Sequence, residues 1–517
     1  MMNARHKLAI FSWSMYDFAN SAYTTLIVTF IYATYFTKAI APNEIIGTEL
    51  WSRAVSITAI TVAILSPIIG AIADRGGYRK LFLFLFTVLA VLGSAMLYWA
   101  YPGQMMKALV WFVIGNIAFE IGGVFYNAFL PDIAPKNRIG RISGYGWSLG
   151  YVGGLGAMFL AMILFVNPIK PSFGQVQTSS LPEAGEKTEW ASLALSEIES
   201  TTGYQVFEFN GERYEVRGIS MDEYAMATGI RVLSEEGEMS TFSRDTVDKL
   251  NAMLGYDLWE KANKVGNNIR ATNLLVALWF ALFSIPIFIF VREDKSTMNP
   301  KGVPVISSGF KQLYTTFHEI KHFNEIVKLL VARLFYNDGL VTIFAFGGIY
   351  AAGTFGFTFQ EIMLFGIVLN ITAGLGAFVM GFMDDKSGGK RTINFSLWAL
   401  ICATFLAIFA PSKTYFWLAG ILVGIFSGPN QAASRSLMGR FVPPDKENEF
   451  FGFFAFSGKA TAFLGPMILG LLTSAFHSQR AGVSIVLVFF LIGLWLLRQV
   501  DEEEGIRIAN RGDEVYY

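Results

Sequence analysis

The sequence predicts an all-α membrane protein of twelve transmembrane helices in two six-helix pseudo-repeats, interrupted by a small α+β extracytoplasmic insertion. Of its 517 residues, 53% are hydrophobic and only 15% are charged, and long apolar runs recur along the chain. Soluble domains usually carry about 25% charged residues. A bilayer resolves this imbalance, because lipid covers the apolar helix faces that would otherwise be exposed to water.

Twelve runs approach the roughly 20 residues that a helix needs to cross the hydrocarbon core. They are residues 9–38, 52–73, 81–101, 108–130, 142–166, 271–291, 327–351, 360–383, 392–410, 415–438, 450–475 and 482–498. Only the short stretch Gly353–Gln360 separates the seventh run from the eighth. Basic residues precede the first run, as in a signal peptide, but Asp17 and Asn20 interrupt it and no small-residue cleavage site follows. We therefore expect a retained first helix.

Lysine and arginine gather in alternate loops, and this bias predicts which loops are cytoplasmic. With both termini on the cytoplasmic side of a cell (inner) membrane, the short outer loops hold only Lys107, Lys413 and Arg480. The expected organisation is an N-terminal half at 1–166 with spans one to five, an extracytoplasmic insertion at 167–270, a sixth span at 271–291, a cytoplasmic linker at 292–326, a six-helix C-terminal half at 327–498 and a cytoplasmic tail at 499–517.

The insertion is polar, with 17 acidic and 9 basic residues between 168 and 268. Tyr204–Phe209 and Glu212–Arg217 flank an Asn-Gly pair, which is a strong signal for a β-hairpin with a type I′ turn. A capping box at Ser220 and a helical pattern over 243–264 predict two helices. A small folded domain is the favoured interpretation, and a wholly disordered loop is the alternative.

A short motif occurs twice, after the second and after the eighth apolar run. Both copies fit the pattern G-x-x-x-D-R/K-x-G-x-R/K-R/K without a gap. The first copy contains Gly70, Asp74, Arg75, Gly77, Arg79 and Lys80, and the second contains Gly381, Asp385, Lys386, Gly388, Lys390 and Arg391. Six spans separate the copies, and an even number keeps both in the same orientation. The halves are therefore predicted to be parallel repeats about an axis normal to the membrane.

This pattern resembles the signature loop of the major facilitator superfamily, and two copies at equivalent positions make the resemblance specific. Further stretches resemble the branch of the autophagy-related vacuolar amino-acid effluxers, which has uncharacterised bacterial relatives. These stretches are Tyr16–Tyr23, Asn127–Pro131, Gly140–Gly144, Tyr336–Gly339, Phe450–Gly452 and Ser457–Lys459. The resemblance covers the membrane part of the chain but not residues 168–268. It implies a major facilitator fold, alternating access and amino acids as the substrate class.

The signature loops are candidates for a gate at the cytoplasmic surface. A carboxylate facing an arginine or a helix N-terminus can hold two segments together, and water readily breaks such a contact. The candidate gating residues in these loops are Asp74, Arg75, Arg79, Asp385, Lys386 and Lys390. The alternative is that the basic residues only fix topology.

Ionisable residues inside the spans are the sharpest functional signal, because each costs roughly 2.5–3.5 kcal/mol near a helix centre. They are Asp17, Glu120, Asp338, Arg435 and Lys459. The resemblance implies that spans one, four, seven and ten line a central cavity, and four of the five residues lie on those spans. Glu120 or Asp338 is the expected substrate-binding or protonatable carboxylate, unless a neighbour such as Asn116 merely satisfies Glu120. Asp17 is expected to pair with Lys459 or Arg435, as an inner gate or as a static buried pair.

Neutral polar side chains on the same spans can donate hydrogen bonds to a zwitterionic solute. The candidates are Asn20, Tyr336, Asn430 and Gln431. Asn430 and Gln431 follow a Gly-Pro pair that frees backbone carbonyls. The alternative role for such residues is interface anchoring or helix–helix contact.

Enzyme, metal and cofactor signatures are absent from the sequence. It has no Walker loop and one cysteine (Cys402). Of its four histidines, His318 and His322 are four apart on a predicted helix, but no further ligands accompany them. The net charge of zero gives no basis for a nucleic-acid partner. The expected partners are a small-molecule solute, the lipid bilayer and a proton or cation that drives transport. The oligomeric state is left open.

Two functions remain. The first is secondary active transport of a small polar solute by alternating access. The second is a non-transporting membrane receptor or sensor that uses the insertion at 167–270 to bind a ligand or partner. The paired signature loops and the carboxylates at mid-span favour transport, because a sensor needs neither.

Overall fold

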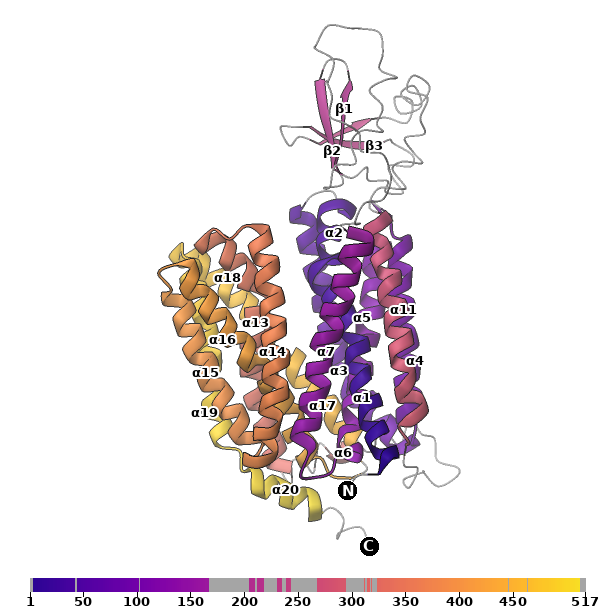
Figure 1. The fold of residues 1–517 in the computed structure, drawn as a ribbon, viewed down its shortest axis with the longest axis vertical. Helices are drawn as coiled ribbons and strands as arrows, with labels where there is room; N and C mark the ends of the chain where they lie inside the picture. The colour runs from indigo at the N-terminus through magenta and orange to yellow at the C-terminus, as the bar shows by residue number, and fades with distance from the viewer. Residues whose placement is uncertain are drawn as a thin grey trace.

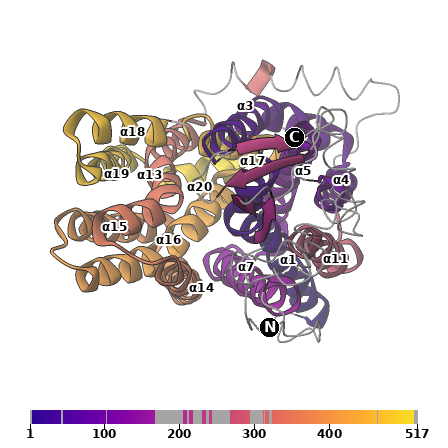
Figure 2. The same ribbon diagram turned by 90° about the horizontal axis from the view of Figure 1, so that it is seen from above.

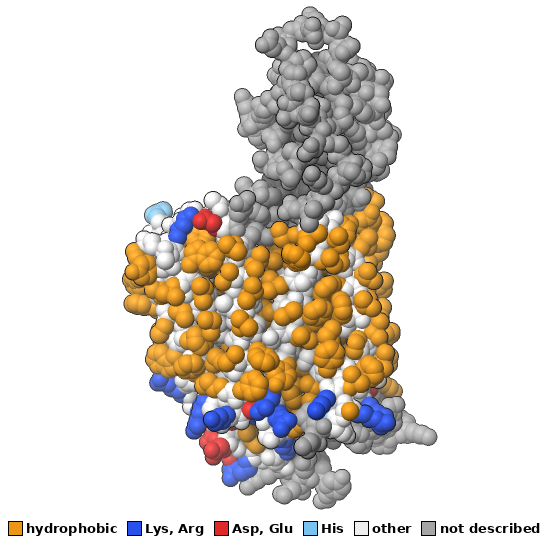
Figure 3. Space-filling view, viewed as in Figure 1, with side chains coloured by type: hydrophobic (Ala, Val, Ile, Leu, Met, Phe, Trp, Pro, Cys, Tyr) orange, Lys and Arg blue, Asp and Glu red, His pale blue; other side chains and the backbone are white. Residues whose placement is uncertain are grey.

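The computed structural model describes residues 3–41, 44–101, 103–166, 204–209, 212–217, 230–234, 239–242, 267–293, 311, 314–316, 318, 323–444, 446–462 and 464–511. Most of these residues form a bundle of long helices (Figure 1), and hydrophobic side chains cover the lateral face of the bundle (Figure 3). Among the described residues, ten helices are long and apolar enough to cross a membrane. The prediction of a multi-span helical membrane protein is confirmed.

The first half of the bundle comprises the helices up to α11. They are α1 (Ala4–Ala22), a π-helical segment (Tyr23–Phe30), α2 (Tyr32–Tyr35), a second π-helical segment (Phe36–Ile40), α3 (Glu44–Gly76), α4 (Arg79–Met96), a 3₁₀ turn (Leu97–Trp99), α5 (Met105–Ala128), α6 (Leu130–Ile133), α7 (Ile139–Ala161), a third π-helical segment (Met162–Val166) and α11 (Asn267–Phe290).

The second half comprises α13 and the helices after it. They are α13 (Asn324–Phe355), α14 (Phe359–Ser387), α15 (Gly389–Phe409), α16 (Lys413–Phe441), α17 (Glu447–Lys459), α18 (Leu464–Phe476), α19 (Gln479–Arg498) and α20 (Glu502–Arg511). The predicted separation of the seventh and eighth runs is confirmed, because Gly356 ends α13 with φ of 64° and Thr358 caps α14. The predicted run 450–475 lies within one candidate span, Glu447–Phe476, which comprises the two helices α17 and α18.

Two of the twelve predicted spans are helical but are not among the ten candidate spans found in the described residues. They are the interrupted helix from Ala4 to Ile40 and the helix α16. Both carry polar and charged residues, including Asp17 and Arg435, that lower their hydropathy. Such residues avoid lipid and face a protein interior or a water-filled cavity. These two helices are therefore the first place to look for a functional site.

The two halves lie side by side, as Figure 2 shows from above. They meet mainly where α17 packs on α3 and α14 packs on α7. Both chain ends lie at one end of the bundle (Figure 1), which we call the terminal face. It includes Gly76 and Ser387, where α3 and α14 end, and Ile139 and Glu447, where α7 and α17 begin. The opposite end is called the far end.

Four strands lie beyond the far end of the first half (Figure 1). They are β1 (Tyr204–Phe209), β2 (Glu212–Arg217), β3 (Ile230–Ser234) and β4 (Met239–Phe242), in the order β1-β2-β3-β4. The predicted hairpin strands are present with the predicted bounds and pair antiparallel. The sequence analysis missed β3 and β4. The predicted helices at Ser220 and 243–264, and the Asn-Gly turn itself, lie outside the described residues.

Candidate functional site

The first signature loop joins the halves at the terminal face. Asp74, near the end of α3, accepts hydrogen bonds from the backbone N–H groups of Asn448 (3.1 Å) and Glu449 (2.8 Å) in the first turn of α17. The Asn448 side chain donates a third bond of 2.6 Å. A carboxylate here satisfies donors that the helix cannot pair itself and complements the positive end of its dipole. Asp74 therefore caps a helix of the opposite half.

The second signature loop makes the same contact in the reverse direction. Asp385, at the end of α14, accepts hydrogen bonds from the backbone N–H groups of Gly140 (2.8 Å) and Arg141 (3.2 Å) in the first turn of α7. It also forms an ion pair with the Arg141 side chain. In each copy the aspartate binds the second and third residues of a helix in the other half. The contact follows the pseudo-two-fold symmetry of the repeat.

Glycines allow this close approach. A Cβ on Gly70 would lie 2.3 Å from the Asn448 carbonyl oxygen, and one on Gly381 would lie 2.9 Å from the Arg141 Cα. The motif glycines Gly77 and Gly388 have φ of 62° and 93°, a left-handed conformation that turns the chain between two helices. These four positions explain why the motif needs glycine.

The basic residues of the loops differ in role. Arg79 donates to Glu447 of α17 (2.9 Å) and to the Ala128 carbonyl (3.0 Å), and it forms an ion pair with Asp132. Lys390 donates to the Arg498 carbonyl within its own half. Arg75 and Lys386, at matching positions, are exposed. Only Arg79 among these four residues therefore bridges the halves in the described structure.

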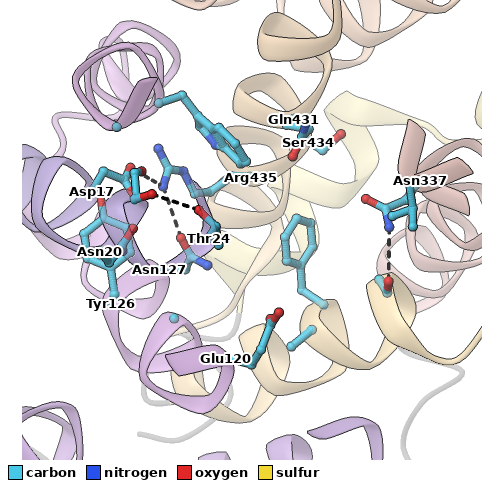
Figure 4. Close-up of a pocket in the computed structure, with 18 of the residues that line it drawn as sticks. Asp17, Asn20, Thr24, Glu120, Tyr126, Asn127, Asn337, Gln431, Ser434 and Arg435 are labelled. Atoms are coloured by element: carbon cyan, nitrogen blue, oxygen red, sulfur yellow. Dashed lines mark hydrogen bonds and ion pairs between the residues drawn. The ribbon is translucent and has the colours of Figure 1, made fainter. Parts of the chain in front are cut away.

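A cavity of about 410 Å³ lies between the halves, and Figure 4 shows it in close-up. Its lining comes from α1, the π-helical segment Tyr23–Phe30, α5 and α7 of the first half and from α13, α14, α16 and α17 of the second. The predicted site residues that line it are Asp17, Asn20, Glu120, Tyr336, Asn430, Gln431, Arg435 and Lys459. The structure thus gathers most of the candidates around one cavity, whose lining also includes apolar side chains.

Arg435 crosses from α16 into the first half at this cavity. Its guanidinium donates to Asp17 Oδ2 (3.0 Å), Asn127 Oδ1 (3.2 Å) and both oxygens of Ser143 (2.7 and 2.9 Å). Figure 4 shows the side chain reaching toward Asp17 and Asn127. The ring of Trp13 lies 4.8 Å from the guanidinium carbon. Of the two predicted partners of Asp17, the structure selects Arg435, which is 4% exposed.

Lys459 pairs with Glu120 instead. Its Nζ lies 2.6 Å from Glu120 Oε1, which joins the end of α17 to α5 across the cavity. These two side chains are 32% and 23% exposed, so solvent reaches the pair. The contacts of Glu120 in the described residues do not include Asn116, the alternative partner named above. A second interhalf ion pair thus lies in the cavity wall, more open than the first.

Arg333 was missed in the sequence analysis although it lies inside a predicted span. It lines the cavity from α13 and donates to the Phe454 carbonyl (2.7 Å) and Ser457 Oγ (2.8 Å). Its guanidinium carbon lies 3.7 Å from the centroid of the Phe454 ring. Among the described residues no ion pair includes Arg333. The same criterion that singled out Arg435, an ionisable residue in an apolar run, identifies it.

The neutral candidates divide between lining and packing. Asn20 and Gln431 line the cavity, and both are labelled in Figure 4. The Tyr336 hydroxyl forms a 2.8 Å hydrogen bond with Ser434, and the fully buried Asn430 donates to Ser396. Tyr336 therefore already has a partner and chiefly fixes the shape of the wall. Asn430 has a partner for its Nδ2, whereas its buried Oδ1 has none in the described residues.

Asp338 stands apart from the other candidates. It is 2% exposed and is not among the residues that line the cavity. Its Oδ2 accepts a hydrogen bond of 3.2 Å from the backbone N–H of Gly465 in α18. Its neighbour Asn337 lines the cavity and donates to the Gly458 carbonyl. The side chain of Asp338 thus faces α18 rather than the cavity.

Residues 48–182 and 238–510 match the protein family described as "Vacuole effluxer Atg22 like". The chain is 23% identical to the uncharacterized MFS-type transporter YxiO of Bacillus subtilis over 98% of this chain and 97% of that protein. It is 22% identical to autophagy-related protein 22-1 of Aspergillus niger over 92% and 78% of the respective chains. The structure resembles that of FucP, a major facilitator superfamily transporter, in its outward conformation, with a TM-score of 0.65, 11% identity and coverage of 96% and 99%.

Proposed function

Because the chain belongs to the Atg22-like family of major facilitator transporters, whose members are not enzymes, we propose that it moves a small zwitterionic solute, of the amino-acid class, by alternating access. The predicted resemblance to this branch is thus confirmed, while the substrate and its coupling belong to the proposal. The observation that carries the proposal is the distribution of charge in the cavity.

The cavity is electrically polarised. Its described charged lining residues are Asp17 and Glu120 in the first half and Arg333, Arg435 and Lys459 in the second. A zwitterion has an ammonium group that carboxylates attract and a carboxylate that arginine and lysine attract. Charge-assisted hydrogen bonds of this kind are roughly twice as strong as neutral ones. An amino acid placed across the cavity complements both walls at once.

Glu120, Lys459 and Arg333 are the groups best suited to contact the solute. Glu120 and Lys459 are partly exposed to the cavity and can exchange their mutual ion pair for the ammonium and carboxylate of a substrate. Arg333 has no acidic partner in the described residues, so it offers a cation that a substrate carboxylate can bind. Asp17 and Arg435 are less exposed and are paired with each other, and we assign them to the inner gate.

The structure corresponds, in this proposal, to a state closed at the terminal face. The two aspartate caps and the Arg435 contacts join the halves there, whereas the helices diverge toward the far end in Figure 1. Lys and Arg side chains gather at the terminal face in Figure 3, and the positive-inside rule then places that face in the cytoplasm. The state is accordingly outward-facing, and both termini are cytoplasmic.

The coupling ion is proposed to be a proton or another cation. Accumulation of a solute against its own gradient needs an energy source, and the sequence has no nucleotide-binding loop. Ionisable groups inside the spans are the usual sites of proton relays in transporters. An ion gradient is therefore the driving force that fits the residues present.

The test is counterflow of radiolabelled amino acids in proteoliposomes that contain the purified full-length chain. Counterflow above that of protein-free liposomes is expected for at least one amino acid. Glu120→Gln and Arg333→Gln should each raise its KM by about tenfold or more, because each removes a charged hydrogen bond worth roughly 1.5–3 kcal/mol. Arg53→Gln, which breaks an exposed ion pair with Glu49 on a lateral face of α3, is the matched control and should leave the KM unchanged.

A failure of counterflow for all amino acids would reject the substrate class. Counterflow of a neutral sugar that is insensitive to Glu120→Gln and Arg333→Gln would reject the polarised cavity as the recognition element. Absence of flux for every solute, together with ligand binding by the region around the β-strands, would favour the receptor function instead.

A further inference from the structure

A buried carboxylate at mid-span has no role in the cavity. Asp338, on α13, accepts one hydrogen bond, at Oδ2 from the Gly465 N–H. Its Oδ1 is buried and has no hydrogen-bond partner in the described residues. An ionised carboxylate is costly in such surroundings unless it is paired or hydrogen-bonded. The position is therefore poised between a charged and a neutral form.

The two aspartates of the signature loops provide an internal comparison. Asp74 accepts three hydrogen bonds, and Asp385 accepts two backbone hydrogen bonds and pairs with Arg141. All three carboxylates face the first turn of a helix from another element. Only Asp338 has a single donor and no cation. The donors that surround the carboxylates of Asp74 and Asp385 are therefore largely missing around the carboxylate of Asp338.

The surrounding elements do not supply the missing cation. α13 packs against α19, α17, α16, α18, α14 and α20. The helix α20 lies at the start of α13, where the Asp501 backbone N–H just before it donates to Glu325. α18 contains no charged residue, and the charged residues of α14 and α19 lie near their ends, Arg480 and Arg498 in the case of α19. On α17 Lys459 is engaged by Glu120, and on α16 Arg435 is engaged by Asp17. On α13 itself, Arg333 binds α17 and Tyr336 binds Ser434.

Asp338 lies beside the break that divides the predicted eleventh span. α13 holds both sides of this break. Asn337 donates to the Gly458 carbonyl at the end of α17, and Asp338 accepts from Gly465 at the start of α18. Thr461, between the two helices, donates to the Leu334 carbonyl. The residue at the end of α17 is Lys459, which bridges to Glu120 in the other half. A change in the charge of Asp338 can therefore move the break between α17 and α18, and with it the nearby ion pair between Lys459 and Glu120.

We propose that Asp338 binds and releases the coupling proton at a site separate from the substrate cavity, and that the break between α17 and α18 transmits its charge state to the Glu120–Lys459 pair. This inference rests on the transport function proposed above and assigns its coupling site. A proton from water binds a carboxylate oxygen on one side of the membrane and returns to water on the other.

The physical effect of the proton is on the start of α18. The charged form accepts the Gly465 N–H strongly and complements the positive end of the helix dipole. The neutral form loses that attraction and gains an O–H donor, so α18 is held less tightly against α13. A proton shifts a conformational equilibrium only if it binds one state more tightly than the other. The changed contact between Asp338 and the start of α18 provides this difference in proton affinity between the two states.

The first test needs no substrate. Infrared difference spectra of the full-length chain in lipid vesicles, recorded between alkaline and acidic pH, should show the C=O stretch of a buried protonated carboxyl. Asp338→Asn should remove the band, and Asp338→Glu should keep it at a shifted frequency. Glu120→Gln should leave it in place. A band that survives in Asp338→Asn, disappears in Glu120→Gln, or responds to sodium rather than to pH would overturn the proposal.

The second test measures coupling. In proteoliposomes with the amino acid found by counterflow, Asp338→Asn should lower proton-driven accumulation by about tenfold or more, within the usual range of site-to-site coupling. Counterflow, which needs no net proton movement, should stay within about twofold of the wild type in the same variant. Equal loss of both activities would reject a dedicated proton site. If no amino acid is carried, the proposed function fails, and the infrared result still decides whether Asp338 titrates.

Discussion

The terminal face and the cavity are both formed by contacts between the halves. The two halves contribute equivalent residues at the terminal face but residues of opposite charge in the cavity. At the terminal face, Asp74 and Asp385 make equivalent contacts to α17 and α7. In the cavity, the acidic lining residues come from the first half and the basic ones from the second. A gate between two similar halves can be symmetric. A site for a small solute with unlike ends cannot, so recognition requires that the repeat diverge.

Arg435 is where the two regions meet, and its removal is the change with the largest expected effect. Arg435→Gln leaves Asp17, whose side chain is 15% exposed, without a cation, and breaking a largely buried pair in this way costs about 3–5 kcal/mol. We expect counterflow to fall by at least about a hundredfold and thermal stability in detergent to drop. The double variant Asp17→Asn with Arg435→Gln should recover part of the stability, since it removes the orphaned charge.

The Arg435 prediction would fail if the single and double variants were equally stable, because the pair would then make no specific contribution. Arg53→Gln serves as the control for loss of one arginine. Its partner Glu49 is 54% exposed, and exposed pairs contribute only about 0–1 kcal/mol. Its stability and flux should match those of the wild type.

The next largest effect is expected at the glycines of the helix crossings. Gly70→Ala places a Cβ 2.3 Å from the Asn448 carbonyl oxygen, and Gly381→Ala places one 2.9 Å from the Arg141 Cα. Overpacking of this kind costs about 1–3 kcal/mol, with the greater cost at Gly70. Both should open the terminal face. The distance between spin labels at the exposed Arg75 and Lys386 positions, in a chain with Cys402 replaced by serine, measures this opening.

Gly347→Ala is the matched control for these glycine variants, because a Cβ there meets no atom within 4 Å. It should leave the label distance unchanged. An unchanged distance in Gly70→Ala as well would mean that the crossing of α3 and α17 is not part of the gate.

The symmetry itself is tested by Asp74→Asn and Asp385→Asn. Each keeps an oxygen acceptor but loses the charge at a helix N-terminus, an effect of about 1–2 kcal/mol in partly buried geometry. The population open at the terminal face should rise by about five- to thirtyfold in either variant. The two shifts should agree within about threefold, since the contacts are equivalent. A shift in one variant alone would show that the gate is asymmetric.

How much of this arrangement the sequence predicts depends on how local each contact is. The repeated motif predicts the two caps because glycine, aspartate and basic residues keep fixed spacing on one helix end. The hairpin strands follow from an Asn-Gly pair between two β-rich runs. The pairing of Glu120 with Lys459 could not be predicted in this way, since 339 residues separate them and only the packing of α5 beside α17 brings them together.

The same argument explains why the Asp338 side chain, predicted to lie in the cavity, faces α18 in the structure. Asp338 and Asn337 are adjacent in sequence but diverge by about 100° around a helix, so one faces the cavity and the other faces α18. Depth along a span can be estimated from sequence, whereas the direction of a side chain depends on which helices pack around it. Arg435 illustrates the converse case: sequence predicted it as a possible partner of Asp17, and only the packing of α7 and α16 distinguishes it from Lys459.

The smallest expected effect concerns a polar cluster of similar chemistry at the far end. There Glu361 completes a capping box with Thr358 and pairs with Lys413 (2.9 Å), all within the second half. The hydrogen bond from the Thr358 backbone N–H, followed by the contact with Lys413, holds the pKa of the Glu361 carboxyl below its ordinary value. Because the pKa is lowered in the folded protein, the contribution of the charged Glu361 to folding stability is present at neutral pH. It is lost as the pH falls through the lowered pKa. All residues of this cluster belong to the second half, so it does not connect the two halves. Glu361→Gln should therefore change neither the label distance at the terminal face nor counterflow at neutral pH. A shift as large as that of Asp74→Asn would mean that polar caps stabilise the transporter wherever they occur, and the distinction between gate and scaffold would be lost.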